Sequence, residues 1–232
     1  MKKDKRIFDA VKDGDLESVK ALLEGGADPD IRDQYRETPL IYAAQGDSLP
    51  IVEELLKHGA KIDFRGERRW TPLRYAIDRR KNDIAKYLIA RGADIDSKTT
   101  DGETPLYGAV FKSSEEIVGL LLGLGADANI VTKGHSTCLK IAVAYPDNLA
   151  IVKLLVEGGA DLSLYPKDFL STAIFTSATY GGTAVVEYLL DSGTEYSPEL
   201  LENRIELLGK FSSHKPGTRA VIDLLRERMR SG

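Results

Sequence analysis

Apolar and polar positions alternate with a helical period over most of the chain. In the segment 83–106, one side of a short helix carries the apolar residues Ile84, Leu88 and Ile89. Gly92 follows the last apolar turn and is expected to end the helix in the left-handed conformation, which glycine adopts without steric cost. Residues 94–103 are polar and rich in turn formers, so they predict a loop that leaves the helices and returns.

The same pattern returns at a fixed spacing. Thr-Pro-Leu stands at 38–40, 71–73 and 104–106, with a degraded copy at 137–139, so each copy begins 33 residues after the last. Threonine caps free helical amides and proline suits the first helical position, so each copy predicts a helix start. The predicted helix-ending glycines follow the same spacing and then slip by one residue: Gly26, Gly59, Gly92, Gly125, Gly159 and Gly193. A period of this length predicts stacked helix pairs.

These residues resemble the ankyrin-repeat family, whose pattern is Thr-Pro-Leu-His, two alanines, Ile-Val, Leu-Leu and Gly-Ala-Asp. The copies here include LPIVEELLKHGAKID, NDIAKYLIARGADID and EEIVGLLLGLGADAN. The resemblance covers nearly the whole chain. It implies an all-α solenoid of about seven stacked helix-turn-helix units with β-hairpin-like finger loops. The family's histidine is replaced by other residues, which implies less rigid helix starts: Ile41, Arg74, Tyr107, Lys140 and Phe175.

The resemblance also implies one ankyrin-repeat domain over residues 1–232. Its expected parts are an N-terminal capping repeat (1–30), four regular repeats (31–163), a degenerate repeat (164–196) and a C-terminal capping repeat (197–232). The N-terminal capping repeat has no Thr-Pro-Leu and carries charge on its outward side, as a terminal repeat must to stay soluble.

Composition narrows the class of protein. Hydrophobic residues at 42% and charged residues at 29% exclude a disordered chain, whereas the net charge of −4 is too small to identify a partner. The single cysteine, Cys138, fits a reducing compartment. No run approaches the ~18 apolar residues of a membrane helix, and no signal sequence is evident. We therefore expect a cytoplasmic protein with no membrane partner and favour a monomer, while secretion by a signal-independent route stays open.

Residues that could perform chemistry are scattered. The three histidines, His58, His135 and His214, fall in different repeats, so no His/Cys metal set is expected. Cys138 has only His135 as a nearby base. The acidic pairs recur once per repeat at turns, which indicates capping rather than a calcium or glycosidase site. We expect no catalytic residues, no metal and no cofactor, and hence no enzyme.

The resemblance implies a protein partner gripped by the finger tips and the first helix of each repeat. Between residues 65 and 81 the chain carries five more cations than acids, and Trp70 and Tyr75 are interleaved with them. Trp, Tyr and Arg are enriched at interface hot spots. This pattern predicts a partner with an acidic segment. The alternative is that Trp70 packs across the finger base and the arginines form a solvated face.

The sequence therefore predicts a non-catalytic scaffold, inhibitor or regulatory subunit, with a secreted bacterial or viral effector that binds a host protein as the alternative. Nucleic acid is a less favoured partner, because its binders carry positive charge over a whole face. The predicted partner-binding residues are Arg32, Tyr35, Arg65, Arg68, Trp70, Arg74, Tyr75, Lys98, Asp101, Glu103 and Tyr107.

Overall fold

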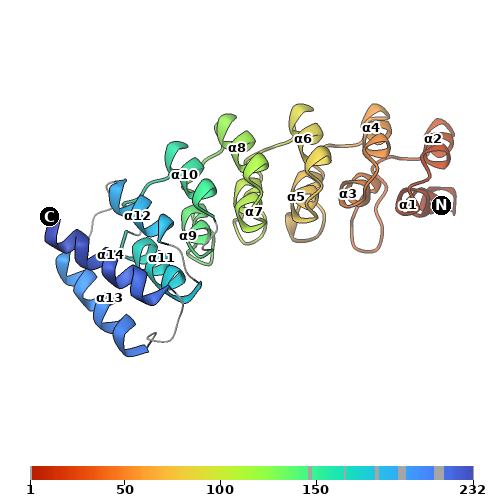
Figure 1. Ribbon diagram of the computed structural model, residues 1–232. Helices are drawn as coiled ribbons and strands as arrows, with labels where there is room; N and C mark the ends of the chain where they lie inside the picture. The colour runs from red at the N-terminus through yellow and green to blue at the C-terminus, as the bar shows by residue number, and fades with distance from the viewer. Residues whose placement is uncertain are drawn as a thin grey trace. The chain divides into compact units, whose positions relative to one another are not determined.

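The computed structural model describes residues 2–145, 148–164, 166–180, 183–192, 197–211 and 217–231. Within these residues the chain consists of α-helices, one short 3-10 helix and connecting loops, with no strand (Figure 1). The prediction of an all-α protein is confirmed for this part of the chain. Two compact units divide it, residues 1–134 and residues 135–232.

The first unit is built from pairs of antiparallel helices (Figure 1). The first helices of successive pairs pack on one another in the order α1, α3, α5 and α7, and the second helices pack in the order α2, α4, α6 and α8. The elements are α1 (Lys2–Lys12), α2 (Leu16–Glu24), α3 (Pro39–Gln45), α4 (Leu49–Lys57), η1 (Glu67–Arg69), α5 (Pro72–Asp78), α6 (Asn82–Ala90), α7 (Pro105–Phe111) and α8 (Glu115–Gly123).

Helix starts and ends in this unit follow the repeated residues. The hydroxyls of Thr38, Thr71 and Thr104 each accept a hydrogen bond from the backbone N–H three residues later, and proline occupies the next position in each helix. The predicted helix-ending glycines adopt left-handed φ angles of 83–87° at Gly26, Gly59, Gly92 and Gly125. The local predictions of helix boundaries are thus confirmed here.

The core of the first unit lies between the two layers of helices. The leucine of each Thr-Pro-Leu copy is completely buried, as are the repeated small side chains of the second helices, Val19, Val52, Ala85 and Val118. Burial of these apolar side chains at every pair provides most of the driving force for the stack. Carboxylates link neighbouring loops as well: Asp30 and Asp63 accept hydrogen bonds from the backbone N–H groups of Lys61 and Asp94.

Three loops, which we call fingers 1, 2 and 3, precede α3, α5 and α7 and span residues 31–37, 64–70 and 97–103. In each finger a backbone N–H donates to the carbonyl oxygen four residues later, from Asp33 to Glu37, Gly66 to Trp70 and Thr99 to Glu103. The N–H of Thr100 in turn donates to the carbonyl oxygen of Arg68, which joins finger 3 to finger 2. The fingers are therefore hydrogen-bonded turns, and no strand is formed within them.

The second unit starts as a similar pair and then departs from it. Here α9 (Cys138–Ala142) packs with α10 (Leu149–Glu157), and α10 also contacts α12 (Ala184–Asp191). The longer α11 (Pro166–Tyr180) packs against α12, α13 (Pro198–Phe211) and α14 (Thr218–Ser231). Gly159 has the predicted left-handed conformation. The inserted loop residues 146–147, Gly193, His214 and the predicted break at 215–216 lie outside the described residues.

Candidate partner-binding surface

Arg74 is the centre of a packed cluster at the start of α5. Its side chain is buried, although the sequence pattern places it where a partner would be contacted. One nitrogen, Nη2, donates to Glu103 Oε2 of finger 3 at 3.0 Å, and the guanidinium lies 4.4 Å from the centre of the Trp70 ring. Asp78 Oδ1 lies 3.9 Å from Nη1. The arginine therefore connects finger 2, finger 3 and α5 from inside.

The guanidinium fits because α7 carries a glycine beside it. A Cβ atom built on Gly108 would lie 2.6 Å from Arg74 Nη1 and 2.9 Å from Arg74 Cζ, closer than real Cβ contacts come. In the two preceding repeats the same helix position carries a tyrosine, Tyr42 or Tyr75. Gly108 thus leaves the space beside α5 that the buried guanidinium of Arg74 occupies.

The two tyrosines occupy the same helix position and both donate to finger carboxylates. Tyr42 donates to Asp33 Oδ2 at 2.6 Å, and Tyr75 donates to Glu37 Oε1 of finger 1. Burial raises the pKa of both phenols, and the adjacent carboxylate in each case raises the pKa further. The Tyr75 ring also meets the Trp70 ring edge to face, with centroids 5.1 Å apart. Tyr75 therefore joins finger 1 to the Arg74 cluster.

The tips of fingers 1 and 2 are basic, because the two acids of finger 1 are used internally and finger 2 has one acid against three arginines. Glu37 is buried against Tyr75, and Asp33 accepts hydrogen bonds from the backbone of its own finger and from Tyr42. Glu67 remains exposed. The exposed side chains on these two tips otherwise include five cations and one aromatic: Arg32, Tyr35, Arg36, Arg65, Arg68 and Arg69.

The predicted residues of the finger tips lie in different local surroundings. Tyr35 is 59% exposed at the tip of finger 1. Arg32 lies 5.1 Å from the Phe64 ring, and Arg65 forms a long ion pair of 3.9 Å with Asp94. Arg68 is exposed on the 3-10 turn of finger 2. These four side chains remain accessible, whereas Trp70 is half-buried in the Arg74 cluster.

Finger 3 contributes less charge to the surface. Lys98 and Asp101 are exposed and opposite in sign, and Glu103 is half-buried in its ion pair with Arg74. The backbone N–H of Tyr107 is capped by Thr104, and its side chain is half-buried. The structure therefore brings Trp70, Tyr75 and Glu103 together around Arg74, and it leaves Lys98 and Asp101 outside that group.

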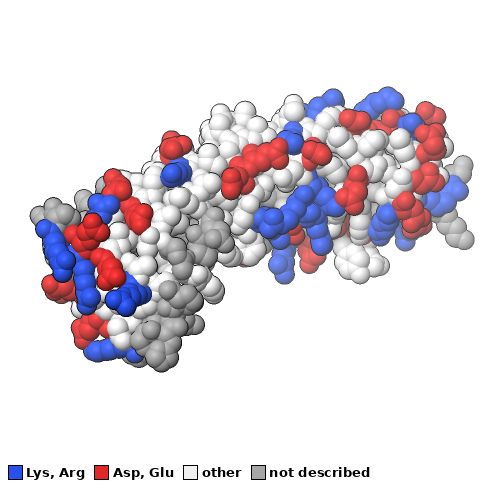
Figure 2. Space-filling model, viewed as in Figure 1, with Lys and Arg blue, Asp and Glu red and all other residues white. Residues whose placement is uncertain are grey.

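Sequence reasoning overlooked the C-terminal ends of α5 and α7. Arg79 is exposed just after α5, and Phe111, the last residue of α7, is 49% exposed. Lys112 follows Phe111 and pairs with Asp78 at 3.0 Å. Figure 2 shows Lys and Arg gathered over α5 and α7, and Asp and Glu over α6 and α8. An aromatic residue at a helix end, where a polar residue serves the fold equally well, was the available signal.

Comparison with known proteins identifies the family. A family model described as ankyrin repeats in three copies matches residues 7–99, 83–166 and 106–199, which together cover most of the chain. The chain belongs to the ankyrin-repeat family. Ankyrin repeats are protein–protein interaction modules and are typically non-catalytic. A search of curated proteins gave no match.

The candidate chemical residues that the structure describes in this ankyrin-repeat protein lie in different local surroundings. Cys138 is completely buried at the start of α9, and His135 is exposed before it. His58 ends α4, with Nδ1 3.0 Å from the backbone oxygen of Glu54, as expected for a capping histidine. In the described ranges no three His, Cys, Asp or Glu side chains are grouped so that they could hold a metal ion.

The acidic pairs of the ankyrin repeats act as turn and helix caps, as predicted. In three loops the first aspartate accepts a hydrogen bond from the backbone N–H two residues later: Asp28, Asp94 and Asp127. Asp15 caps α2 through Ser18, and these hydrogen bonds lower the pKa of the Asp15 carboxyl. Among the helices that the structure describes, none combines the length and apolar character needed to cross a membrane.

Proposed function

We propose that this ankyrin-repeat chain is a non-catalytic scaffold, inhibitor or regulatory subunit that binds an acidic segment of a partner protein. The binding surface is the finger tips together with the neighbouring ends of the first helices, on the concave side of a stack of about seven units. One observation carries the proposal: the two acids of finger 1 are used internally, and the five exposed arginines of fingers 1 and 2 outnumber the single exposed acid, Glu67. Opposite charge on the partner would guide association and fix its register.

The residues have different roles in this proposal. The direct contacts come from Arg32, Tyr35, Arg65 and Arg68, with Lys98 and Asp101 at the edge of the interface. Because Trp70, Arg74, Tyr75 and Glu103 contact one another, they fix the fingers and act as positioning residues. Tyr107 lies beside them at the start of α7.

We further propose that the protein acts in the cytoplasm as a monomer and has no enzymatic activity or cofactor. A secreted effector that binds a host protein would use the same surface and would differ only in location. Cell fractionation with an antibody to the chain distinguishes the two: the effector reading requires the chain in the medium or in host cells.

The test is affinity capture from native lysate with matched charge reversals. We expect Arg68→Glu to lower recovery of the main partner about tenfold, as loss of a central arginine does at interfaces. Arg91→Glu, an equal charge change at the end of α6, is the control and should leave recovery unchanged. Arg68→Glu is a sharper variant than Trp70→Ala, because removal of Trp70 also disrupts its packing on Arg74.

Equal recovery with Arg68→Glu and wild type, both folded by circular dichroism, would contradict the proposal. Nucleic acid is the competing ligand for interleaved arginine and aromatic residues. A gel shift of single-stranded RNA at low salt that is abolished by Arg68→Glu, without any protein captured, would favour that class of partner instead.

A further inference from the structure

The C-terminal ends of α5 and α7 present an exposed aromatic ring among cations. We call this group the helix-end patch and define it as Arg79, Arg80, Phe111 and Lys112. Phe111 is 49% exposed, although the corresponding last residues of α3 and α5 are polar, Gln45 and Asp78. A single exposed aromatic is ordinary on a protein surface. Its surroundings are what set this one apart.

The cations of the helix-end patch can form further ion pairs or hydrogen bonds with a partner. The side chains of Arg79 and Arg80 are exposed and make no hydrogen bond or ion pair within the described part of the chain. Lys112 Nζ lies 5.8 Å from the centre of the Phe111 ring and 3.0 Å from Asp78 Oδ1. The Asp78 carboxylate is already shared, because Arg74 Nη1 lies 3.9 Å from it. The patch therefore carries net positive charge.

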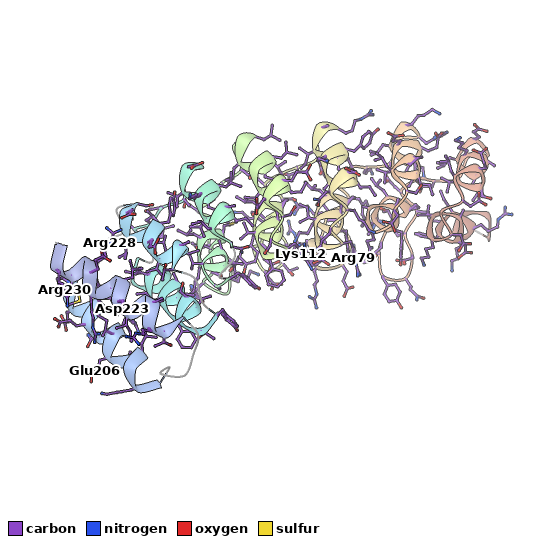
Figure 3. All side chains as sticks on the ribbon, in the orientation of Figure 1. Arg79, Lys112, Glu206, Asp223, Arg228 and Arg230 are labelled. Atoms are coloured by element: carbon purple, nitrogen blue, oxygen red, sulfur yellow. The ribbon has the colours of Figure 1, made fainter. Side chains whose placement is uncertain are left out.

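The figures place this charge on one side of the first unit. In Figure 3 the labelled Arg79 and Lys112 both lie at the lower ends of α5 and α7. Figure 2 shows the blue surface of Lys and Arg over the same two helices. The preceding helix end, after α3, carries Gly46 and Asp47 instead. The patch therefore does not extend to the helix end that precedes it.

We propose that the helix-end patch binds an apolar side chain that is flanked by carboxylates in the partner's acidic segment. Phe111 would take the apolar side chain, and Arg79, Arg80 and Lys112 would take the carboxylates around it. This inference rests on the proposed function and deepens it, because it adds an apolar requirement that the basic finger tips do not impose. Partial burial of an apolar side chain against an aromatic ring yields specificity beyond charge.

The test uses two short synthetic peptides labelled with fluorescein. Both consist of aspartate and glutamate, and they differ only at the central position, which is leucine in one and serine in the other. Their binding to the full chain is measured by fluorescence anisotropy at low salt. We expect wild type to prefer the leucine peptide about tenfold, a factor that one apolar contact can provide. Phe111→Ser should abolish the preference and leave affinity for the serine peptide unchanged.

Two further variants separate this inference from the proposed function. Leu124→Ser removes an equally exposed apolar side chain, 54% exposed at the end of α8, and should retain the preference. Arg79→Glu should weaken both peptides, as should Arg68→Glu on finger 2. If Arg68→Glu weakens binding but wild type shows no preference, or Phe111→Ser retains it, the inference is wrong and the proposed function stands. If wild type binds neither peptide, or Arg68→Glu has no effect, the charge argument behind both is wrong.

Discussion

At the scale of single residues, Arg74 shows how a residue expected at the interface can serve the fold. The family's histidine position holds an arginine here; its Nη2 pairs with Glu103 and Trp70 covers the guanidinium, while Nε and Nη1 are buried without a hydrogen-bond partner among the described residues. Because Arg74 is buried, removing its half-buried partner Glu103 is costly. The cluster stays intact only while Gly108 leaves space for the guanidinium.

Gly108→Ala tests that space directly. We expect it to lower the free energy of unfolding by about 1–3 kcal/mol, because the new methyl group would overlap a pinned guanidinium. In an Arg74→Ala background the same change should raise stability by up to ~1 kcal/mol, since alanine favours a helix more than glycine does. Urea denaturation of the four proteins measures both effects.

Gly123→Ala is the control for this pair, because a Cβ atom at Gly123 would meet nothing within 4 Å. It should be neutral or stabilising in both backgrounds. A Gly108→Ala effect that does not depend on residue 74 would show that the guanidinium does not occupy the space above this glycine.

The raised pKa of Tyr75 predicts that the folded protein loses stability at alkaline pH. Burial and, second, the hydrogen bond to Glu37 raise its pKa above the ordinary value of 10.0, so the neutral phenol is favoured in the folded state. The associated stability is fully present below pH 10.0 and is lost as the pH rises through the raised pKa. Urea denaturation at neutral pH and above pH 10.0 should therefore show a smaller alkaline loss in Tyr75→Phe than in wild type.

The control for the alkaline experiment is Tyr35→Phe, which removes the hydroxyl of an exposed tyrosine. Its alkaline loss should equal that of wild type. At neutral pH Tyr75→Phe itself should cost ~1 kcal/mol, because the buried Glu37 carboxylate loses a donor. An unchanged alkaline loss in Tyr75→Phe would contradict the account of this tyrosine.

At the scale of elements, the fingers repeat a strained backbone position. The residue that precedes the last residue of each finger is left-handed, with φ of 63° at Arg36, 60° at Arg69 and 80° at Gly102. Only the third finger has glycine there, and for other residues this conformation costs ~1–2 kcal/mol. Two fingers therefore carry an arginine where glycine would be less strained.

Arg36→Gly should raise the free energy of unfolding by about 0.5–1 kcal/mol, as relief of backbone strain exceeds the greater entropy that glycine gives the unfolded chain. The reverse change, Gly102→Ala, should destabilise by about 1 kcal/mol, since its Cβ atom would have ordinary contacts and only strain would be added. Thermal and urea unfolding measure both variants. A destabilised Arg36→Gly protein would show that the arginine makes a contact worth more than its strain.

The parts of the elements that depend on nearby sequence were predictable. Threonine caps, first-turn prolines and left-handed glycines act within a few residues, so the repeat fixed the helix boundaries. The burial of Arg74 was not predictable, because Glu103 comes from another repeat and Gly108 carries no side chain to reveal the space. In the second unit the Thr-Pro-Leu signal persists only as the degraded copy at 137–139, so the length of α11 could not be read from it.

At the scale of the whole molecule, charge is sorted between the faces of the first unit. Both carboxylates of finger 1 bond to tyrosines, whereas exposed acids such as Glu116 lie on the second helices and pair there with Lys86. Although the net charge is −4, the edge formed by fingers 1 and 2 is therefore basic. That edge, rather than the overall balance, is the basis for expecting an acidic partner.

The most direct test of the binding surface is site-specific photocrosslinking. A photoreactive phenylalanine analogue is placed at Tyr35 on finger 1 or at Glu53 on α4, both exposed positions in the first unit. Irradiation in native lysate should covalently trap a partner protein from position 35 and none from position 53. Equal trapping from both positions, or trapping from position 53 alone, would contradict the claim that the finger side holds the partner.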